Sequence, residues 1–146
     1  MSISKEKIRF TYEDYLHLPD DGKRYQVIEG EVYMVPAPTP YHQDVLRKLL
    51  ILLSEFVEEH VPRKAYCAPC DVVLSQENIV QPDIFFICKE REHIVTEGNI
   101  RGAPDLVVEI ILIAPHNDTE VRCHSSYERY RDSTRNYAKD YTFARA

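Results

Sequence analysis

Two unbroken apolar runs, each with an acidic residue at its edge or within it, constrain the fold of this chain more than any other feature. Asp83 comes immediately before the run Ile84–Ile87, and Glu109 follows the first residues of the run Leu106–Leu112. Runs rich in Val, Ile and Phe are typical of strands that are buried on both faces. Because an unpaired carboxylate is costly in such surroundings, another group must compensate the charges of Asp83 and Glu109.

A divalent cation is one such group. Hard carboxylate oxygens on adjacent strands can converge on one ion and leave coordination positions for water and phosphate. The pattern therefore indicates a metal-dependent nuclease. The alternative is that each acid lies just outside its strand and is solvated or paired with an Arg or Lys side chain, which is the commoner situation when one acid is considered alone.

The length of the chain and its charge set further limits. A chain of 146 residues is expected to form one domain, residues 1–146, with a substantial core. The formal net charge of −6 argues against a positive surface that grips a phosphate backbone over a long footprint. It does not exclude nucleic acid, because a cluster of metal-binding acids contributes to this balance and a bound cation would reverse the local sign.

The apolar runs and the cysteines indicate where in the cell the protein is expected and whether thiol chemistry is a candidate function. No run reaches the roughly 18 apolar residues of a membrane span, so a cytoplasmic protein with no membrane association is expected. Its four cysteines should then be reduced thiols. Cys67 and Cys70 have the C-x-x-C spacing of a redox pair or half a zinc site, but a strand pattern follows and no second close pair exists. Small buried thiols are the simpler interpretation.

Local patterns predict the order of the elements. Thr11 is a helix N-cap with acids in the following turn, Gly30 is the centre of a hairpin, and apolar residues recur at helical spacing from Tyr41 to His60. The predicted strands after the long helix are Ala65–Leu74, Val80–Cys88 and Leu106–Leu112. A further helix is predicted from His116 to Tyr130, although it has almost no apolar face, and a poorly ordered tail from Arg131 to Ala146.

Five segments together resemble the Uma-type restriction endonuclease family of the PD-(D/E)xK nuclease superfamily. They are Tyr25–Met34, Pro36–Gln43, Asp71–Leu74, Val80–Ile84 and Gly102–Ile110. The resemblance implies a restriction-endonuclease-like α/β core, in which a mixed central β-sheet is flanked by helices and preceded by an N-terminal β-hairpin. It also implies that Asp83 and Glu109 are ligands of Mg²⁺ or Mn²⁺ and that the substrate is nucleic acid, with DNA favoured.

Three further residues match family positions. Glu31 could supply an outer carboxylate or bind the ion through water, and His42 could orient a water or a phosphate. A solvated turn acid and a capping or packing histidine are the respective alternatives. Asp71 also matches, but its place at the start of a strand favours a structural hydrogen bond.

The resemblance weakens after Glu109. The family usually continues with a Leu-Ser-Pro-Ser-Thr type loop, an Asp, a Lys four residues later, and a closing strand that contains Trp. Here Ile111–Pro115 replaces the loop, Asp118 matches the Asp, Arg122 stands in the Lys place, and the chain has no Trp. Residues 113–146 are therefore atypical. An Arg stays charged, so it can stabilise a transition state but is a poor general base.

Three functional hypotheses follow. The first is a hydrolase, a Mg²⁺- or Mn²⁺-dependent endonuclease that cleaves DNA, with Asp83 and Glu109 at the metal and Glu31, His42 and Arg122 in support; its activity could be impaired. The second is a catalytically inactive relic of the same fold that binds nucleic acid or protein. A homodimer through the long helix or an exposed sheet edge is open in this case. The third is a redox or zinc protein built on the cysteine pair.

Overall fold

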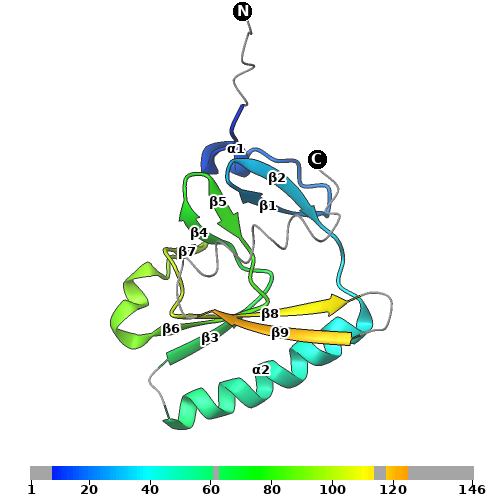
Figure 1. The fold of residues 1–146 in the computed structure, drawn as a ribbon. Coiled ribbons are helices and arrows are strands. Elements are labelled where there is room, and N and C mark those ends of the chain that lie inside the picture. Colours follow the sequence, from blue (N-terminus) through cyan, green and yellow to red (C-terminus); the bar gives the residue numbers. More distant parts are fainter. Residues whose placement is uncertain (1–7, 61–62, 114–117, 125–146) are drawn as a thin grey trace, which may run out of the picture.

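The computed structural model describes residues 8–60, 63–113 and 118–124, which form two β-sheets, a short helix and a long helix (Figure 1). The elements in chain order are α1 (Tyr12–Leu16), β1 (Arg24–Ile28), β2 (Glu31–Val35), α2 (Pro40–His60), β3 (Arg63–Cys67), β4 (Val72–Ser75), β5 (Asn78–Val80), β6 (Ile84–Cys88), the 3₁₀-helix η1 (Lys89–Ile94), β7 (Ile100–Arg101), β8 (Leu106–Ile113) and β9 (Asp118–His124). No helix in these ranges is long and apolar enough to span a membrane.

The N-terminal elements form where the local sequence patterns predict them. Thr11 caps α1 and forms a reciprocal capping box with Asp14. The strands β1 and β2 pair antiparallel around a two-residue turn in which Glu29 has φ 52° and Gly30 has φ 74°. Positive φ at both central residues is the type I′ arrangement, whose twist matches that of the strands. The predicted short helix and hairpin are both confirmed.

The predicted long helix is also confirmed as α2. Pro40 is its first residue, and the hydroxyl of Thr39 accepts a hydrogen bond of 3.2 Å from the His42 amide, which satisfies one free donor at the helix start. Leu46 and Val57 pack against the sheet that contains β6 and β8. Figure 1 shows α2 lying along one side of this sheet.

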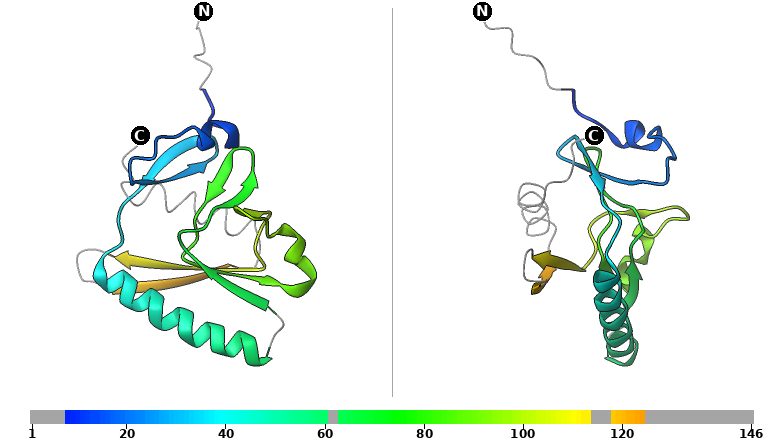
Figure 2. Two further views of the ribbon diagram at one scale, coloured as in Figure 1. Left: turned by 180° about the vertical axis from the view of Figure 1, so that it is seen from behind. Right: turned by 90° about the vertical axis from the view of Figure 1, so that its right-hand side faces the viewer.

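The strands divide between two sheets. The five-stranded sheet has the order β2-β1-β5-β4-β7 and is mixed, because β4 and β7 are parallel; the four-stranded sheet has the order β3-β6-β8-β9. Figure 2 shows the two sheets from behind and from the side, with the hairpin above the four-stranded sheet. The predicted α/β class with helices and an N-terminal hairpin is therefore confirmed. Strand β6 is buried on both faces, as its sequence indicates.

Two predicted strands are each split. Ala65–Leu74 covers most of β3 and β4, Val80–Cys88 covers the last residue of β5 and all of β6, and in both cases the two parts belong to different sheets. The breaks contain Pro69 and Pro82, which cannot donate a backbone hydrogen bond to a sheet. We call residues 68–71 and 81–83, where the chain passes from one sheet to the other, the crossing segments. They lie side by side, since the Ala68 amide donates a hydrogen bond to the Asp83 carbonyl at 3.0 Å.

The predicted helix from residue 116 to residue 130 is wrong over its described part. Residues 118–124 form β9, which pairs antiparallel with β8 in continuous register from Val107↔His124 to Ile113↔Asp118. The strand forms because its period is two: exposed Val121 and Cys123 alternate with charged side chains, and the pairing satisfies the backbone edge of β8. The expected tail, residues 131–146, lies outside the described residues.

Candidate metal centre

Asp83 lies at the point where the chain enters β6 from the five-stranded sheet. The register of β6 and β8, in which Ile84 is opposite Val108, brings Asp83 beside Glu109. The Asp83 amide faces the Glu109 carboxylate oxygen Oε2 at 3.4 Å, and the Asp83 oxygen Oδ2 accepts a hydrogen bond of 2.8 Å from the Ile110 amide. The structure thus brings together the two acids that the apolar runs single out.

Glu109 lies on the face of β8 opposite to α2. Its neighbours Val108 and Ile110 pack in the cluster under α2, and side chains alternate along a strand, so Glu109 shares the other face with Val107. Arg122 is its direct partner on β9, and paired residues of this kind have Cβ atoms about 5 Å apart. The structure therefore places Arg122 beside Glu109.

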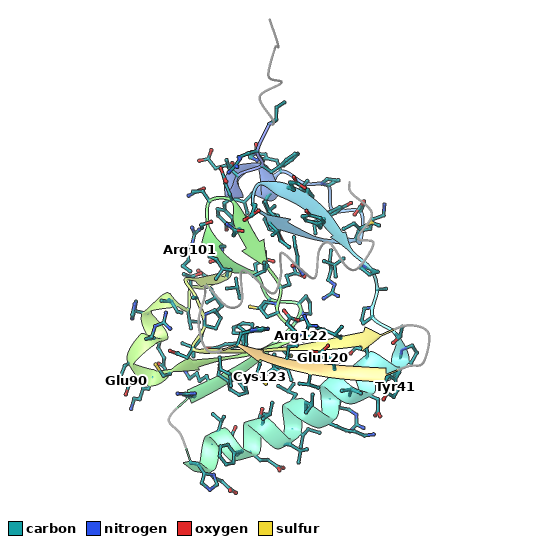
Figure 3. All side chains as sticks on the ribbon, in the orientation of Figure 1. Tyr41, Glu90, Arg101, Glu120, Arg122 and Cys123 are labelled. Carbon is teal, nitrogen blue, oxygen red and sulfur yellow. The ribbon has the colours of Figure 1, made fainter. Side chains whose placement is uncertain are left out.

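The side chain of Arg122 also contacts a residue of its own strand, β9. Its guanidinium donates two hydrogen bonds to the carboxylate of Glu120, at 2.8 Å and 3.0 Å, and this contact lowers the pKa of Glu120. Figure 3 shows the two labelled side chains close together on β9. A guanidinium held in this way keeps its charge at a fixed place next to Glu109.

His42 reaches the same carboxylate from the first turn of α2. Its Nε2 lies 3.3 Å from Asp83 Oδ2, and both side chains are largely buried. The hydrogen bond with Asp83 raises the pKa of His42, against the opposing effect of burial. The other ring nitrogen, Nδ1, is buried and has no partner among the described residues. His42, one of the supporting residues predicted from the sequence, is therefore in direct contact with a proposed ligand.

Arg24 is a residue that the sequence analysis missed. It pairs with Val35 at the end of the hairpin from which the chain continues into α2, and its charge opposes the rise in the pKa of His42. Arg24 forms no ion pair with any described residue. Nothing in the local sequence distinguishes it, since its proximity to the site depends on how the hairpin is joined to α2.

The other two matching acids belong to the five-stranded sheet and its connections. Glu31 begins β2 beside the hairpin turn, and its carboxylate accepts a hydrogen bond of 3.0 Å from the Tyr33 hydroxyl. Asp71 Oδ1 accepts hydrogen bonds from the Tyr15 hydroxyl at 2.9 Å and from Gln81 Nε2 at 2.8 Å. Burial and this carboxylate raise the pKa of Tyr15. Asp71 has the structural hydrogen bonds expected of it.

The donor set at Asp83 and Glu109 suits one kind of metal. Among the described residues, no group of three or more His, Cys, Asp or Glu side chains is arranged to hold an ion. Magnesium commonly binds one or two carboxylates and retains several water ligands, so two adjacent carboxylates fit it better than they fit zinc, which takes a closed set of protein ligands in structural sites. Asp83 and Glu109 supply two carboxylates, the number that such an ion takes from a protein.

The cysteine pair has a different character. Cys67 ends β3 and Cys70 lies in the crossing segment, and both are half-buried free thiols. Burial and the nearby Asp71 raise the pKa of Cys70. A raised pKa keeps a thiol protonated, whereas nucleophilic and metal-binding cysteines need the thiolate.

A solved structure has the same overall fold as this chain. It is described as a putative nuclease belonging to DUF820 from Anabaena variabilis; it shares 17% sequence identity, covers 77% of this chain and 83% of its own, and gives a TM-score of 0.53. The chain thus shares the α/β fold of that protein. The model of the Uma2 family, described as "Putative restriction endonuclease", matches residues 12–131, and the chain belongs to this family. No curated protein matches the chain.

Proposed function

We propose that this chain is an endonuclease that hydrolyses DNA phosphodiester bonds with Mg²⁺ or Mn²⁺ held by Asp83 and Glu109. The observation that supports this most strongly is that Asp83 lies against the Glu109 carboxylate where the chain crosses between the sheets. Membership of the Uma2 family supports nucleic acid as the substrate class. A bound ion would polarise a phosphoryl oxygen and make a bound water more acidic.

The surrounding residues have distinct proposed roles. His42 and the Ile110 amide both contact Asp83 Oδ2, so they fix the orientation of that carboxylate and leave its other oxygen for an ion. Arg122 remains charged beside Glu109, where it can stabilise negative charge on the phosphate but cannot remove a proton from water. Arg24 is a second positive charge near His42 that can attract the phosphate. Glu31 is proposed only as an outer carboxylate.

Nicking of supercoiled plasmid in the presence of Mn²⁺ tests the proposal. The proteins to compare are the unaltered chain, Asp83→Asn, Glu109→Gln and the exposed control Glu90→Gln, purified identically. We expect Mn²⁺-dependent nicking by the unaltered chain and by Glu90→Gln, and a loss of roughly 100-fold or more in the two site variants, because ligand removal costs more than loss of a supporting contact.

Two results would overturn the proposal. Equal nicking by the unaltered chain and Asp83→Asn would assign the activity to a contaminant or to another site. No nicking by folded, unaltered protein would favour the catalytically inactive relic, in which the same fold binds nucleic acid or protein without cleaving it.

A further inference from the structure

One side of α2 carries two large apolar side chains that are exposed. Leu52 is 63% exposed and Phe56 is 55% exposed. At about 100° per residue these two positions lie about 40° apart around the helix. We call them the outer strip of α2. Isolated exposed apolar residues are ordinary, but an aligned set on one helix marks a surface for contact.

The outer strip faces the β9 side of the four-stranded sheet. On the other side of α2, Ser54 and Glu58 line a pocket together with β3. Ser54 lies about 160° around the helix from Leu52. Since β3 and β9 are the two edges of this sheet, the strip and the pocket point to opposite edges.

Strand β9 extends the apolar surface. Val121 is opposite Ile110 and Cys123 is opposite Val108, and both β8 residues are buried under α2. Val121 and Cys123 therefore lie on the α2 face of the sheet, yet both are exposed, Val121 by 43%. The side view in Figure 2 shows β9 projecting to one side of α2, and Figure 3 labels Cys123 on β9.

The charges of α2 indicate what covers this surface. Its first half carries Arg47, Lys48 and the Asp44 that pairs with both of them, a net charge of +1, and its second half carries Glu55, Glu58 and Glu59, a net charge of −3. If two copies of α2 pack antiparallel about Leu52, Lys48 of one copy is opposite Phe56 of the other and within one turn of its Glu55 and Glu59. A parallel pair would instead bring the acidic halves together. Antiparallel pairing also opposes the helix dipoles favourably.

We propose that the chain forms a twofold-symmetric dimer in which the outer strips of two α2 helices pack antiparallel, flanked by the α2 faces of the two β9 strands. A twofold interface needs one self-complementary patch, and the strip with its surrounding charges is such a patch. The contact leaves Glu109 uncovered, because that side chain lies on the opposite face of the sheet. The proposal does not depend on nuclease activity.

Sedimentation equilibrium of the full chain over a range of concentrations tests the dimer. We expect a species of twice the 17.1 kDa of one chain, and a dissociation constant raised about tenfold or more in Leu52→Glu and Phe56→Glu. Ile51→Glu is the matched control: Ile51 is 47% exposed on the same helix but lies about 100° or more away from the strip. Circular dichroism confirms that each variant is folded.

A charge exchange distinguishes the antiparallel arrangement from others. Lys48→Glu alone and the double variant Glu55→Lys/Glu59→Lys alone should each dimerise poorly, because like charges then face one another. Mixed together they should form a heterodimer, since opposite charges face at both ends. A monomeric unaltered chain, equal weakening by Ile51→Glu and Leu52→Glu, or no heterodimer on mixing would overturn the proposal.

Discussion

Asp105 shows how protein groups of this fold stabilise a carboxylate beside an apolar strand. Burial alone would raise the pKa of Asp105, but hydrogen bonds from the Cys88 amide at 2.7 Å and from Arg91 at 2.9 Å lower the pKa below its ordinary value. Arg91 is itself held by the Ala103 carbonyl. Asp83 differs because its described partners, a histidine and one amide, include no Arg or Lys.

Asp105→Ala should destabilise the protein by about 1–3 kcal/mol at neutral pH, the usual range for a partly buried, charge-assisted hydrogen-bonded group. Because the folded-state pKa is lowered, this stabilisation is present above the unfolded pKa of about 4 and is lost as the pH falls through the folded value. Urea denaturation at pH 7 and pH 3 measures it. A difference between the unaltered chain and Asp105→Ala that did not shrink at pH 3 would contradict the account.

His42→Gln should weaken Mn²⁺ binding by roughly 10–100-fold, because it removes the ring that orients Asp83 without removing a ligand. His93→Gln is the control, since His93 is exposed on η1. Calorimetric titration of Mn²⁺ at one fixed pH compares the three proteins. Equal affinities for all of them would mean that His42 only packs against the start of α2.

At the scale of elements, the sequence predicts what local signals determine. The α1 cap, the turn at Gly30 and the apolar period of α2 each act within a few residues, and all three elements form where predicted. The sheet to which a strand belongs is a long-range property. The segments 65–74 and 80–88 therefore read as continuous strands, although each crosses between sheets at its proline.

The candidate site was partly predictable for the same reason. Asp83 and Glu109 were identifiable because a charge next to a buried run is conspicuous, and the pairing of β6 and β8 brings them together. The position of Arg122 depends on β9, which the weak apolar pattern after residue 115 did not reveal as a strand. Arg24 depends on the join between the hairpin and α2, which no residue pattern specifies.

Gly30→Ala should destabilise the hairpin more than Gly22→Ala destabilises its own turn. Both glycines have positive φ, 74° and 76°, which costs an alanine about 1 kcal/mol or more. Only at Gly30 would the added Cβ meet another atom closely, at 2.8 Å from Arg9 Cβ. Thermal unfolding of the two variants gives the comparison, and equal losses of stability would show that Arg9 moves away at no cost.

At the scale of the whole molecule, the candidate site and the proposed dimer surface lie on different faces of the fold. The crossing segments join the sheets and carry Asp83, the face of β8 away from α2 presents Glu109 and its neighbour Arg122, and the outer strip of α2 lies on the remaining side. The overall charge of −6 adds to the cost of placing these two acids together, and His42 and Arg122 are the positively charged or ionisable groups that the fold places beside them.

The most direct test of the central claim is a Mn²⁺ titration followed by electron paramagnetic resonance, which separates free from bound ion without requiring any catalytic activity. The unaltered chain, Asp83→Asn and Glu109→Gln are compared, with circular dichroism to confirm folding. The account predicts Mn²⁺ binding at one site per chain by the unaltered protein and loss of that binding in both variants. Binding that is unchanged in either variant, or absent from the folded unaltered chain, would contradict a metal centre at Asp83 and Glu109.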